Sequence, residues 1–179
     1  VISDVTAESV TARLLSALAA STQALRQAAG PRQLLTEAAR HAQTLLPNAG
    51  SLVAAVSDRR REGVGVVAAS GAWARGDQGV EHRLRLTLVR DVIRTCASIE
   101  VQRAGTAEAI ETLRIVPLVP GTPADHREAV GALAFSRLGA TFSDADQLLI
   151  DEFAGRVGLA LGRAQVHGAA GAGELRLAI

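Results

Sequence analysis

Three neighbouring segments decide the fold: LRIVPL at residues 113–118, VGALAFS at 130–136 and FSDADQLLIDEFA at 142–154. The first two are short apolar runs separated by a loop that contains proline and glycine, a pattern that predicts two β-strands, from Thr112 to Val119 and from Ala129 to Leu138. In the third segment Ser143 and Asp146 have the spacing of a capping box with Asp in its third position, so we expect a helix to begin there. The sequence therefore indicates two strands followed by a long closing helix.

The chain before these segments opens with two predicted helices and a predicted hairpin. Apolar residues recur at helical spacing from Val10 to Leu25 and again from Leu34 to Leu46, with the helix-breaking pair Gly30-Pro31 between them. The apolar period then changes to two at residues 51–57 and 64–70, on either side of a polar turn. This order indicates two helices in tandem followed by a β-hairpin.

The middle of the chain is predicted to mix helix, strand and loop. We expect a loop at residues 71–79, a helix that includes Leu86 to Cys96, and a short strand from Ile99 to Gln102. One helical turn is predicted within residues 107–113. Together with the segments at both ends, these elements predict an α+β domain with an antiparallel sheet and with helices gathered on one face.

The composition excludes several classes of protein. The chain has 179 residues with 48% hydrophobic and 21% charged side chains, which suits one folded core and is too apolar for a disordered segment. A single cysteine cannot form a disulfide within the chain. The net charge of +1 is spread along the chain, so no overall field would attract nucleic acid or an anionic membrane. The sequence pattern predicts neither a membrane span nor a signal peptide.

Five segments, taken in order, resemble a GAF domain, the small-molecule sensor module of many signalling proteins. The segments are LLTEAARHA at 34–42, AGSLVAAV at 49–56, VIRTC at 92–96 before IEV at 99–101, the pair LRIVPL and VGALAFS, and the closing helix at 142–154. The resemblance covers residues 31–166. It implies a sheet of about six antiparallel strands, with N- and C-terminal helices on one face and a loop-covered ligand cavity on the other. Residues 1–30 would form a connecting helix, and residues 167–179 a flexible tail or linker after a helix that ends at about Gln165.

The resemblance places the cavity under the loops between about Gly71 and Leu113. Arginine is a rigid, bidentate donor to carboxylate or phosphate, so an anionic ligand is one option. The alternative for each arginine is an outward orientation, paired with Glu81, Asp91 or Glu111. Aromatic residues make up only 2% of the chain, which leaves little surface for stacking a planar cofactor and favours a small ligand or none. The candidate ligand-binding residues are Trp73, Arg75, Arg85, Arg90, Arg94, Arg114, Phe135 and Ser136.

The residues that specialised GAF domains use to bind or react with their ligands have no counterparts in this sequence. The chain has no Lys, so the Asn-Lys signature of cyclic-nucleotide binding is absent as written. Cys96 is followed by Ala97 and not by the His that usually follows a bilin-bearing Cys, and we interpret Cys96 as a buried or half-buried packing residue. The histidines at 41, 82, 126 and 167 lack metal-ligand spacing; we expect His41 at the surface or a helix end and His82 in a loop. The sequence thus predicts no catalytic residue, metal or cofactor.

Small residues at four-residue spacing on both terminal helices predict a close helix contact. Three glycines in the closing helix need an explanation, because each costs a helix roughly 1 kcal/mol relative to Ala. Two accounts stay open: packing of the terminal helices within one chain, or a homodimer in which they form a bundle with their counterparts. The candidate dimer-interface residues are Leu14, Ala17, Ser21, Ala24, Leu25, Ala154, Val157, Gly158, Leu161 and Gly162.

Two functions from different classes follow from the resemblance. The first is a regulatory sensor domain of a larger cytoplasmic signalling protein, which binds a small molecule and passes the signal through its terminal helices to an output domain of the same parent chain. The second is a ligand-free dimerisation or interaction module. Neither function involves direct contact with nucleic acid or a membrane, and neither is an enzyme activity.

Overall fold

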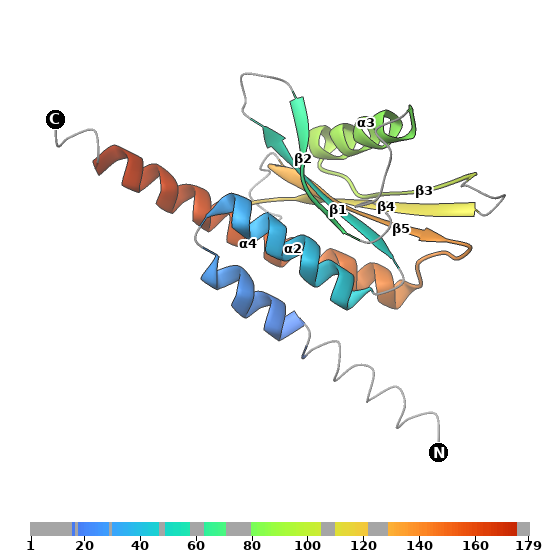
Figure 1. The fold of residues 1–179 in the computed structure, drawn as a ribbon, viewed down its shortest axis with the longest axis horizontal. Coiled ribbons are helices and arrows are strands. Elements are labelled where there is room, and N and C mark those ends of the chain that lie inside the picture. The colour runs from blue at the N-terminus through green and yellow to red at the C-terminus, as the bar shows by residue number, and fades with distance from the viewer. Residues whose placement is uncertain are drawn as a thin grey trace, which may run out of the picture.

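The structure, a computed structural model, contains one antiparallel sheet with helices on both faces (Figure 1). It describes residues 16, 18–28, 30–46, 49–57, 63–70, 80–104, 110–121 and 129–174, of which 51–57, 63–67, 70, 80–85 and 165–174 are described by their backbone alone. The predicted loop at 71–79 and the segment 1–15 lie outside these residues. The α+β class and the antiparallel sheet predicted from the sequence are confirmed.

The sheet has five strands in the described part of the chain, against about six expected, and their order is β2-β1-β5-β4-β3. The strands are β1 (Gly50–Ser57), β2 (Gly63–Ser70), β3 (Ile99–Ala104), β4 (Ile110–Leu118) and β5 (Gly131–Leu138). The predicted hairpin is the β1–β2 pair, and β4 and β5 correspond to the apolar runs at residues 113–118 and 130–136. Pro117 lies inside β4 although proline has no backbone N–H to donate to a neighbouring strand. The pairing of β3 with β4 ends at Ile115, so β3 has no residue opposite Pro117 that would require this hydrogen bond.

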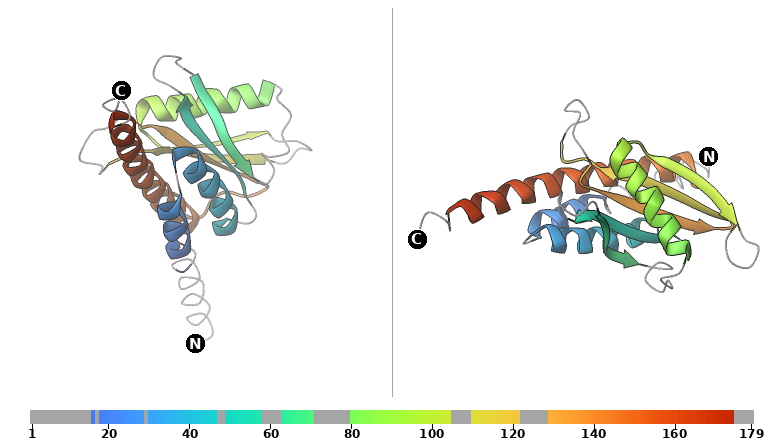
Figure 2. Two further views of the ribbon diagram at one scale, coloured as in Figure 1. Left: turned by 60° about the vertical axis from the view of Figure 1, so that its left-hand side comes forward. Right: turned by 90° about the horizontal axis from the view of Figure 1, so that it is seen from above.

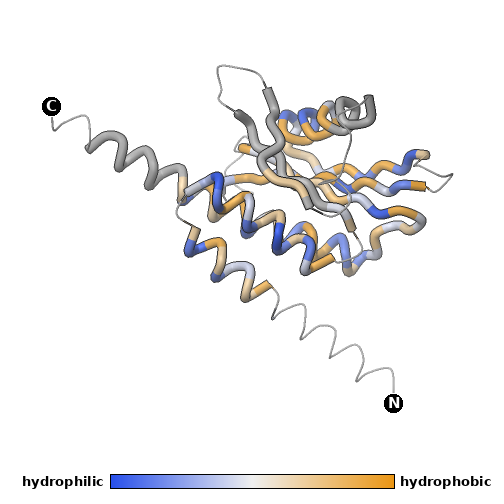
Figure 3. Tube along the Cα trace, viewed as in Figure 1, coloured by the Kyte–Doolittle hydropathy of each residue, from blue (hydrophilic) through white to orange (hydrophobic). Residues whose placement is uncertain are grey.

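One face of the sheet, called here the helix face, is covered by α2 (Pro31–Leu45) and α4 (Asp144–Glu174), and a helix that spans residues 18–27 packs against these helices on the side away from the sheet (Figures 1 and 2). Hydrophobic and hydrophilic residues alternate along α2 (Figure 3), and the buried side chains of both α2 and α4 recur at spacings of three and four residues, so each helix has one apolar side in the core. The larger core cluster lies here and includes Leu34, Phe135 and Phe153, each 2% exposed or less. As predicted, the first and last helices of the domain share one face.

The opposite face of the sheet, called here the α3 face, is covered by α3 (Val80–Thr95) (Figure 2). The core on this side is smaller: Val89 and Val92 of α3 pack with Leu113, Ile115, Ala132 and Ala134. Alternation along β5 separates the two cores, because successive side chains of a strand point to opposite faces. Ala132 and Ala134 therefore belong to the α3 face, and Leu133 and Phe135 to the helix face.

Several local predictions differ from the structure. The helical turn predicted within residues 107–113 is wrong from residue 110 onward, because β4 begins at Ile110 and pairs with both neighbours. The closing helix extends to Glu174 through the segment expected to be a flexible tail, since its alanines favour helix and offset its glycines. His82 lies in α3 and not in a loop.

Cys96 ends α3 and is exposed, so its interpretation as a buried packing residue is wrong. Its φ is +54°, a left-handed conformation that glycine adopts most easily and that commonly terminates a helix.

The predicted start of the closing helix is confirmed in detail. The Ser143 backbone N–H donates to Asp146 Oδ2 at 3.0 Å, and the Asp146 backbone N–H donates to Ser143 Oγ at 3.2 Å, which is a reciprocal capping box. Arg137 of β5 also donates to Asp146 Oδ2 at 2.9 Å, and its guanidinium lies 4.8 Å from the centre of the Phe142 ring. Burial alone would raise the pKa of Asp146, but the hydrogen bonds from Arg137 and Ser143 together lower it below its usual value.

Asp146→Ala is expected to lower the free energy of unfolding by about 1 kcal/mol at neutral pH, because it removes the cap and the Arg137 pair. The folded-state pKa of Asp146 is depressed, so its contribution is complete above the ordinary value of 3.8 and is lost as the pH falls through the folded value. Urea denaturation of wild type and variant between neutral pH and pH ~3 should therefore show the difference shrinking in acid. A difference independent of pH would contradict this account, and Asp144→Ala, in the same exposed first turn, is the control.

Candidate functional site

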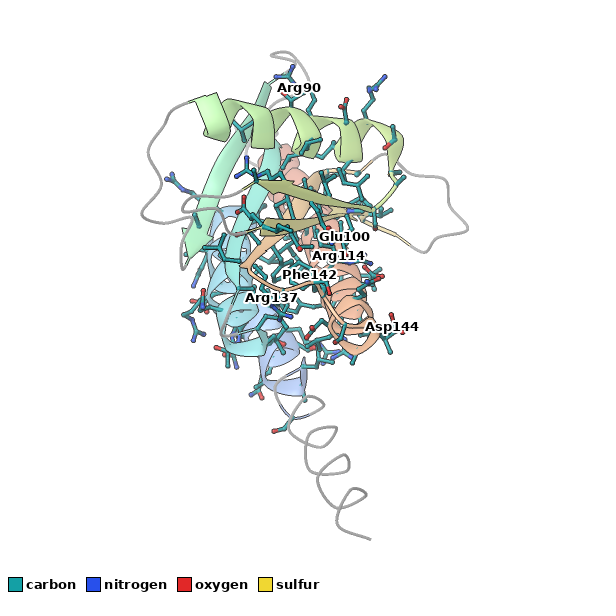
Figure 4. All side chains as sticks on the ribbon, turned by 90° about the vertical axis from the view of Figure 1, so that its right-hand side faces the viewer. Arg90, Glu100, Arg114, Arg137, Phe142 and Asp144 are labelled. Atoms are coloured by element: carbon teal, nitrogen blue, oxygen red, sulfur yellow. The ribbon has the colours of Figure 1, made fainter. Side chains whose placement is uncertain are left out.

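The predicted ligand-binding residues do not gather in one place. Trp73 and Arg75 lie outside the described residues, and Arg85 is described only as part of the α3 backbone. Arg90 and Arg94 are exposed on α3, and Arg90 lies on the side of the helix away from the sheet (Figure 4). Arg94 Nη2 lies 3.3 Å from Asp91 Oδ1, which matches the alternative of outward pairing.

Arg114 and Phe135 lie on the helix face, opposite to the α3 face, which corrects their expected place beside the cavity. The two residues face each other across β4 and β5, so strand alternation turns both to α4. Phe135 fills the larger core there. Arg114 Nη2 donates to both carboxylate oxygens of Asp151 at 2.9 Å, and Nη1 donates to Gln147 Oε1 at 3.3 Å. Glu100, opposite Arg114 on β3, is 3.6 Å from Nη1 (Figure 4).

Ser136 lies on the α3 face, the same face as a charged pair that the sequence alone does not bring together. Its Cα partner across β4 is Leu113, a member of the α3-face core. Two residues before Leu113, Glu111 pairs in register with Arg103 of β3. Arg103 Nε donates to Glu111 Oε2 at 2.6 Å, and the two side chains are only 16% and 5% exposed. We call Arg103, Glu111 and Ser136 the polar cluster.

The polar cluster is an unusual feature of an otherwise apolar surface. Moving a charged pair out of water costs several kcal/mol per ion, and the attraction between the two charges offsets this cost only when their geometry is good. A buried charged pair is therefore weak evidence that its role is only to stabilise the fold. It offers a carboxylate, a guanidinium and a hydroxyl at one end of the α3 face. Chemically, this set can form charge-assisted hydrogen bonds to a small polar molecule.

β4 connects the polar cluster to the closing helix. Glu111 projects to the α3 face, and Arg114, three residues later, projects to the helix face and contacts Asp151 of α4. Arg114 is 9% exposed, so water screens the charge of its guanidinium only weakly, whereas the Asp151 side chain is half-exposed. β4 therefore contributes Glu111 to one face of the sheet and, through Arg114, an ion pair with α4 on the other face.

The predicted dimer-interface residues are mostly buried inside the chain, which corrects their assignment to a contact between chains. Ser21, Leu25, Ala154, Val157 and Leu161 are 5% exposed or less and fill the chain's own core, and Ala24 is half-buried. A Cβ on Gly158 would lie 2.4 Å from Val119 O, and one on Gly162 would lie 2.8 Å from Pro120 Cβ. These glycines admit the chain just after β4. Leu14 and Ala17 lie outside the described residues.

The outer side of the terminal helices carries exposed apolar residues and a groove. On α4, Leu148 is 73% exposed and Leu159 is 42% exposed. A groove of about 630 Å³ runs between the helix at 18–27 and α4. It is lined by Ala19, Thr22, Gln23, Leu25, Arg26, Arg156, Leu159, Ala160 and Arg163.

The described residues hold no cluster of three or more His, Cys, Asp or Glu side chains suited to a metal ion. His41 is half-buried on α2 with its Nε2 3.0 Å from Arg40 Nη2. Burial and the neighbouring Arg40 lower the pKa of His41, against the opposing effect of Glu37. None of the described helices combines the length and hydropathy that a membrane span needs.

Comparison with known proteins finds relatives at the level of structure alone. No family model matches the sequence, and no curated protein matches it either. Among solved structures, the GAF domain of a protein assigned as a sensor histidine kinase in Pseudomonas syringae pv. tomato superposes with a TM-score of 0.65 at 17% identity, over 93% of this chain and 99% of that one.

Two further structures give the same result. The GAF domain of a phosphoenolpyruvate-protein phosphotransferase from Acinetobacter has a TM-score of 0.64 at 16% identity, with 85% of this chain and 94% of that one covered. Residues 122–287 of a methyl-accepting chemotaxis protein give 0.63 at 15% identity, over 82% and 97% of the two chains. The strand order, the two covered faces and these superpositions agree with the resemblance read from the sequence: the chain has the fold of a GAF domain.

Proposed function

We propose that the chain is a regulatory sensor domain that binds a small polar molecule at the polar cluster and passes the change to α4. The observation that supports this most directly is the shielded Arg103–Glu111 pair, placed beside Ser136 on the face that α3 covers. Structural neighbours that come from a sensor kinase and a chemotaxis protein support a signalling role. The domain would act within a larger cytoplasmic protein, with an output domain in the same parent chain.

The proposed relay runs through β4. A ligand that hydrogen-bonds to Glu111 changes the balance of the Arg103 pair and shifts the strand. Arg114 then moves with the strand on the other face and pulls on Asp151. α4 continues past the sheet to Glu174, and its C-terminal end projects away from the body of the domain (Figure 2), so this helix is placed to carry a displacement onward.

The binding step is tested by thermal denaturation with a panel of amino acids, organic acids and nucleotides. A compound present at 100 times its Kd adds about 2.7 kcal/mol, which is a rise in Tm of roughly 5–10 °C for a chain of this length. Glu111→Gln and, separately, Ser136→Ala should abolish most of that rise, whereas Asp91→Asn on the exposed side of α3 should keep it. If no compound in the panel raises Tm, or if both cluster variants respond like wild type, binding at this cluster is rejected.

The relay step is tested on the same compound by hydrogen exchange. Binding should change the exchange of backbone amides in α4 of the wild type. Arg114→Met should keep the rise in Tm and lose the change in α4, because the cluster is intact and the link to Asp151 is gone. An Arg114→Met chain whose α4 still responds to the compound would show that the signal takes another route.

The second candidate function, a ligand-free interaction module, is favoured by the close packing of α3. Val89, Val92, Ala132 and Ala134 are fully buried at its contact with the sheet, which leaves no space between these particular side chains. The thermal panel separates the two functions, because an interaction module gains no stability from any compound and the sensor gains it from at least one.

A further inference from the structure

The groove between the helix at 18–27 and α4 has the size of a small-molecule site. Its volume is about 630 Å³, within the range of roughly 300–1,000 Å³ that is common for ligand sites. Leu25, Leu159 and Ala160 supply apolar surface to the groove, and Leu159 is 42% exposed. Ligand sites usually combine an apolar lining with a few polar or charged groups that orient the ligand. The charged side chains around this groove therefore decide which class of ligand it suits.

All charged side chains that line the groove are arginines: Arg26, Arg156 and Arg163. Arg156 is engaged within the chain, because its Nη1 donates to Thr22 Oγ1 at 3.1 Å and its Nε donates to Glu152 Oε1 at 2.9 Å. Arg26 and Arg163 are exposed and make no side-chain hydrogen bond or ion pair with any residue that the structure describes. Neither has an Asp or Glu three or four residues away along its helix. The groove thus carries two positive charges that no described carboxylate neutralises.

These two arginines lie toward the same end of the groove. The helix at 18–27 and α4 run in the same direction (Figures 1 and 2), and the contact between Thr22 and Arg156 sets their relative position. Arg26 follows Thr22 by about 6 Å along its helix, and Arg163 follows Arg156 by about 10 Å, at 1.5 Å per residue. Leu159 lies on α4 between the two arginines of that helix. One end of the groove is therefore positively charged, and an apolar stretch leads to it.

This arrangement suits an organic anion with an apolar tail. A cleft lined by charge of one sign attracts ions of the opposite sign, and guanidinium groups bind carboxylates through paired N–H donors. A neutral apolar molecule would gain nothing from Arg26 and Arg163. A small inorganic anion would leave the apolar surface at Leu159 and Ala160 in contact with water.

We propose that this groove binds a small carboxylate that carries an aliphatic chain, with the carboxylate between Arg26 and Arg163 and the chain against Leu159 and Ala160. The groove lies on the helix-face side of the sheet, whereas the polar cluster lies on the α3 face, so this site is independent of the proposed sensor site. A ligand bound here contacts the helix at 18–27 and α4 together, and it therefore stabilises the packing of one helix against the other.

Isothermal titration calorimetry of the full chain with octanoate tests the site. Octanoate should bind at a single site, and acetate and octanol should each bind about 10-fold more weakly or less, because acetate lacks the chain and octanol lacks the charge. If octanoate does not bind at millimolar concentration, or binds no more tightly than octanol, the proposal is overturned.

Substitutions around the groove locate the bound octanoate. Arg163→Gln should raise the Kd about 10-fold, since it removes one charge-assisted contact. Leu159→Glu should raise it at least as much, because it removes apolar surface and sets a competing carboxylate four residues before Arg163. That spacing favours the helix, so the variant should stay folded. Arg90→Gln removes an exposed arginine of α3, on the other side of the sheet, and as the matched control should bind like the wild type. Wild-type affinity in both groove variants would reject the site.

Sedimentation equilibrium on the same samples tests whether a second copy of the chain occupies the groove instead. If a small carboxylate is the occupant, the affinity for octanoate should not depend on the protein concentration. A chain that forms dimers and binds octanoate only when diluted to the monomer would show that a second copy fills the groove, and this result also overturns the proposal.

Discussion

Phe153→Ala is expected to lower the free energy of unfolding by about 3–5 kcal/mol, a large part of the 5–15 kcal/mol typical of a whole domain. Phe153 lies on α4, is fully buried, and belongs to the core cluster that joins α2, α4 and the helix face of the sheet. The chain has only three phenylalanines, and its core is filled mainly by Ala, Val and Leu. Small neighbours cannot extend into the space that the ring leaves, so most of the cavity would remain.

Urea denaturation monitored by circular dichroism measures this loss. Leu138→Ala serves as the control: it also removes a large apolar side chain, but Leu138 is 55% exposed and should change the free energy of unfolding by less than about 0.5 kcal/mol. A loss below about 1 kcal/mol for Phe153→Ala would mean that the helix face repacks freely around residue 153, contrary to a core packed from small side chains.

Local sequence signals were sufficient for most of the helices and strands, but not for all of their ends. The capping box at Ser143, the pair Gly30-Pro31 before α2, and the two apolar runs of the β1–β2 hairpin each act over a few residues, and all three are found in the structure. The end of α4 was misplaced because a run of Gly and Ala has no strong stop signal.

Pairing between strands was not available from the sequence, and this limited the prediction of the site. The face that Arg114 occupies follows from the register of β4 with β5, which no local pattern encodes. For the same reason the pairing of Arg103 with Glu111, eight residues apart, follows only from the β3–β4 register, which sets the two residues opposite one another. A candidate set chosen by proximity in sequence therefore mixed residues from both faces of the sheet.

The interface prediction was limited in a different way. Small residues at four-residue spacing predict that another backbone approaches, and at Gly158 and Gly162 it does. The spacing does not identify which segment supplies that backbone. The backbone that approaches is that of residues 119 and 120, just after β4, so Gly158 and Gly162 reflect packing within the chain.

Gly158→Ala is expected to lower the free energy of unfolding by about 2–3 kcal/mol, although alanine is the better helix former. The new Cβ would lie 2.4 Å from the backbone oxygen of Val119 and 2.9 Å from its nitrogen, distances that real Cβ atoms do not reach. The obstructing atoms are backbone, so no side chain can rotate away. Either α4 or the chain after β4 must move, and the buried contacts of Val157 and Leu161 would be disturbed with it.

Gly155→Ala, one turn earlier on the same helix, is the matched control with the opposite sign. Its Cβ would meet nothing within 4 Å in the single chain, so the helix gains roughly 0.5–1 kcal/mol from the better propensity of alanine. Both variants are compared with the wild type by urea denaturation at the same protein concentration. If both substitutions stabilise the chain, the segment after β4 does not pack against Gly158, and the glycine at position 158 would again need an explanation.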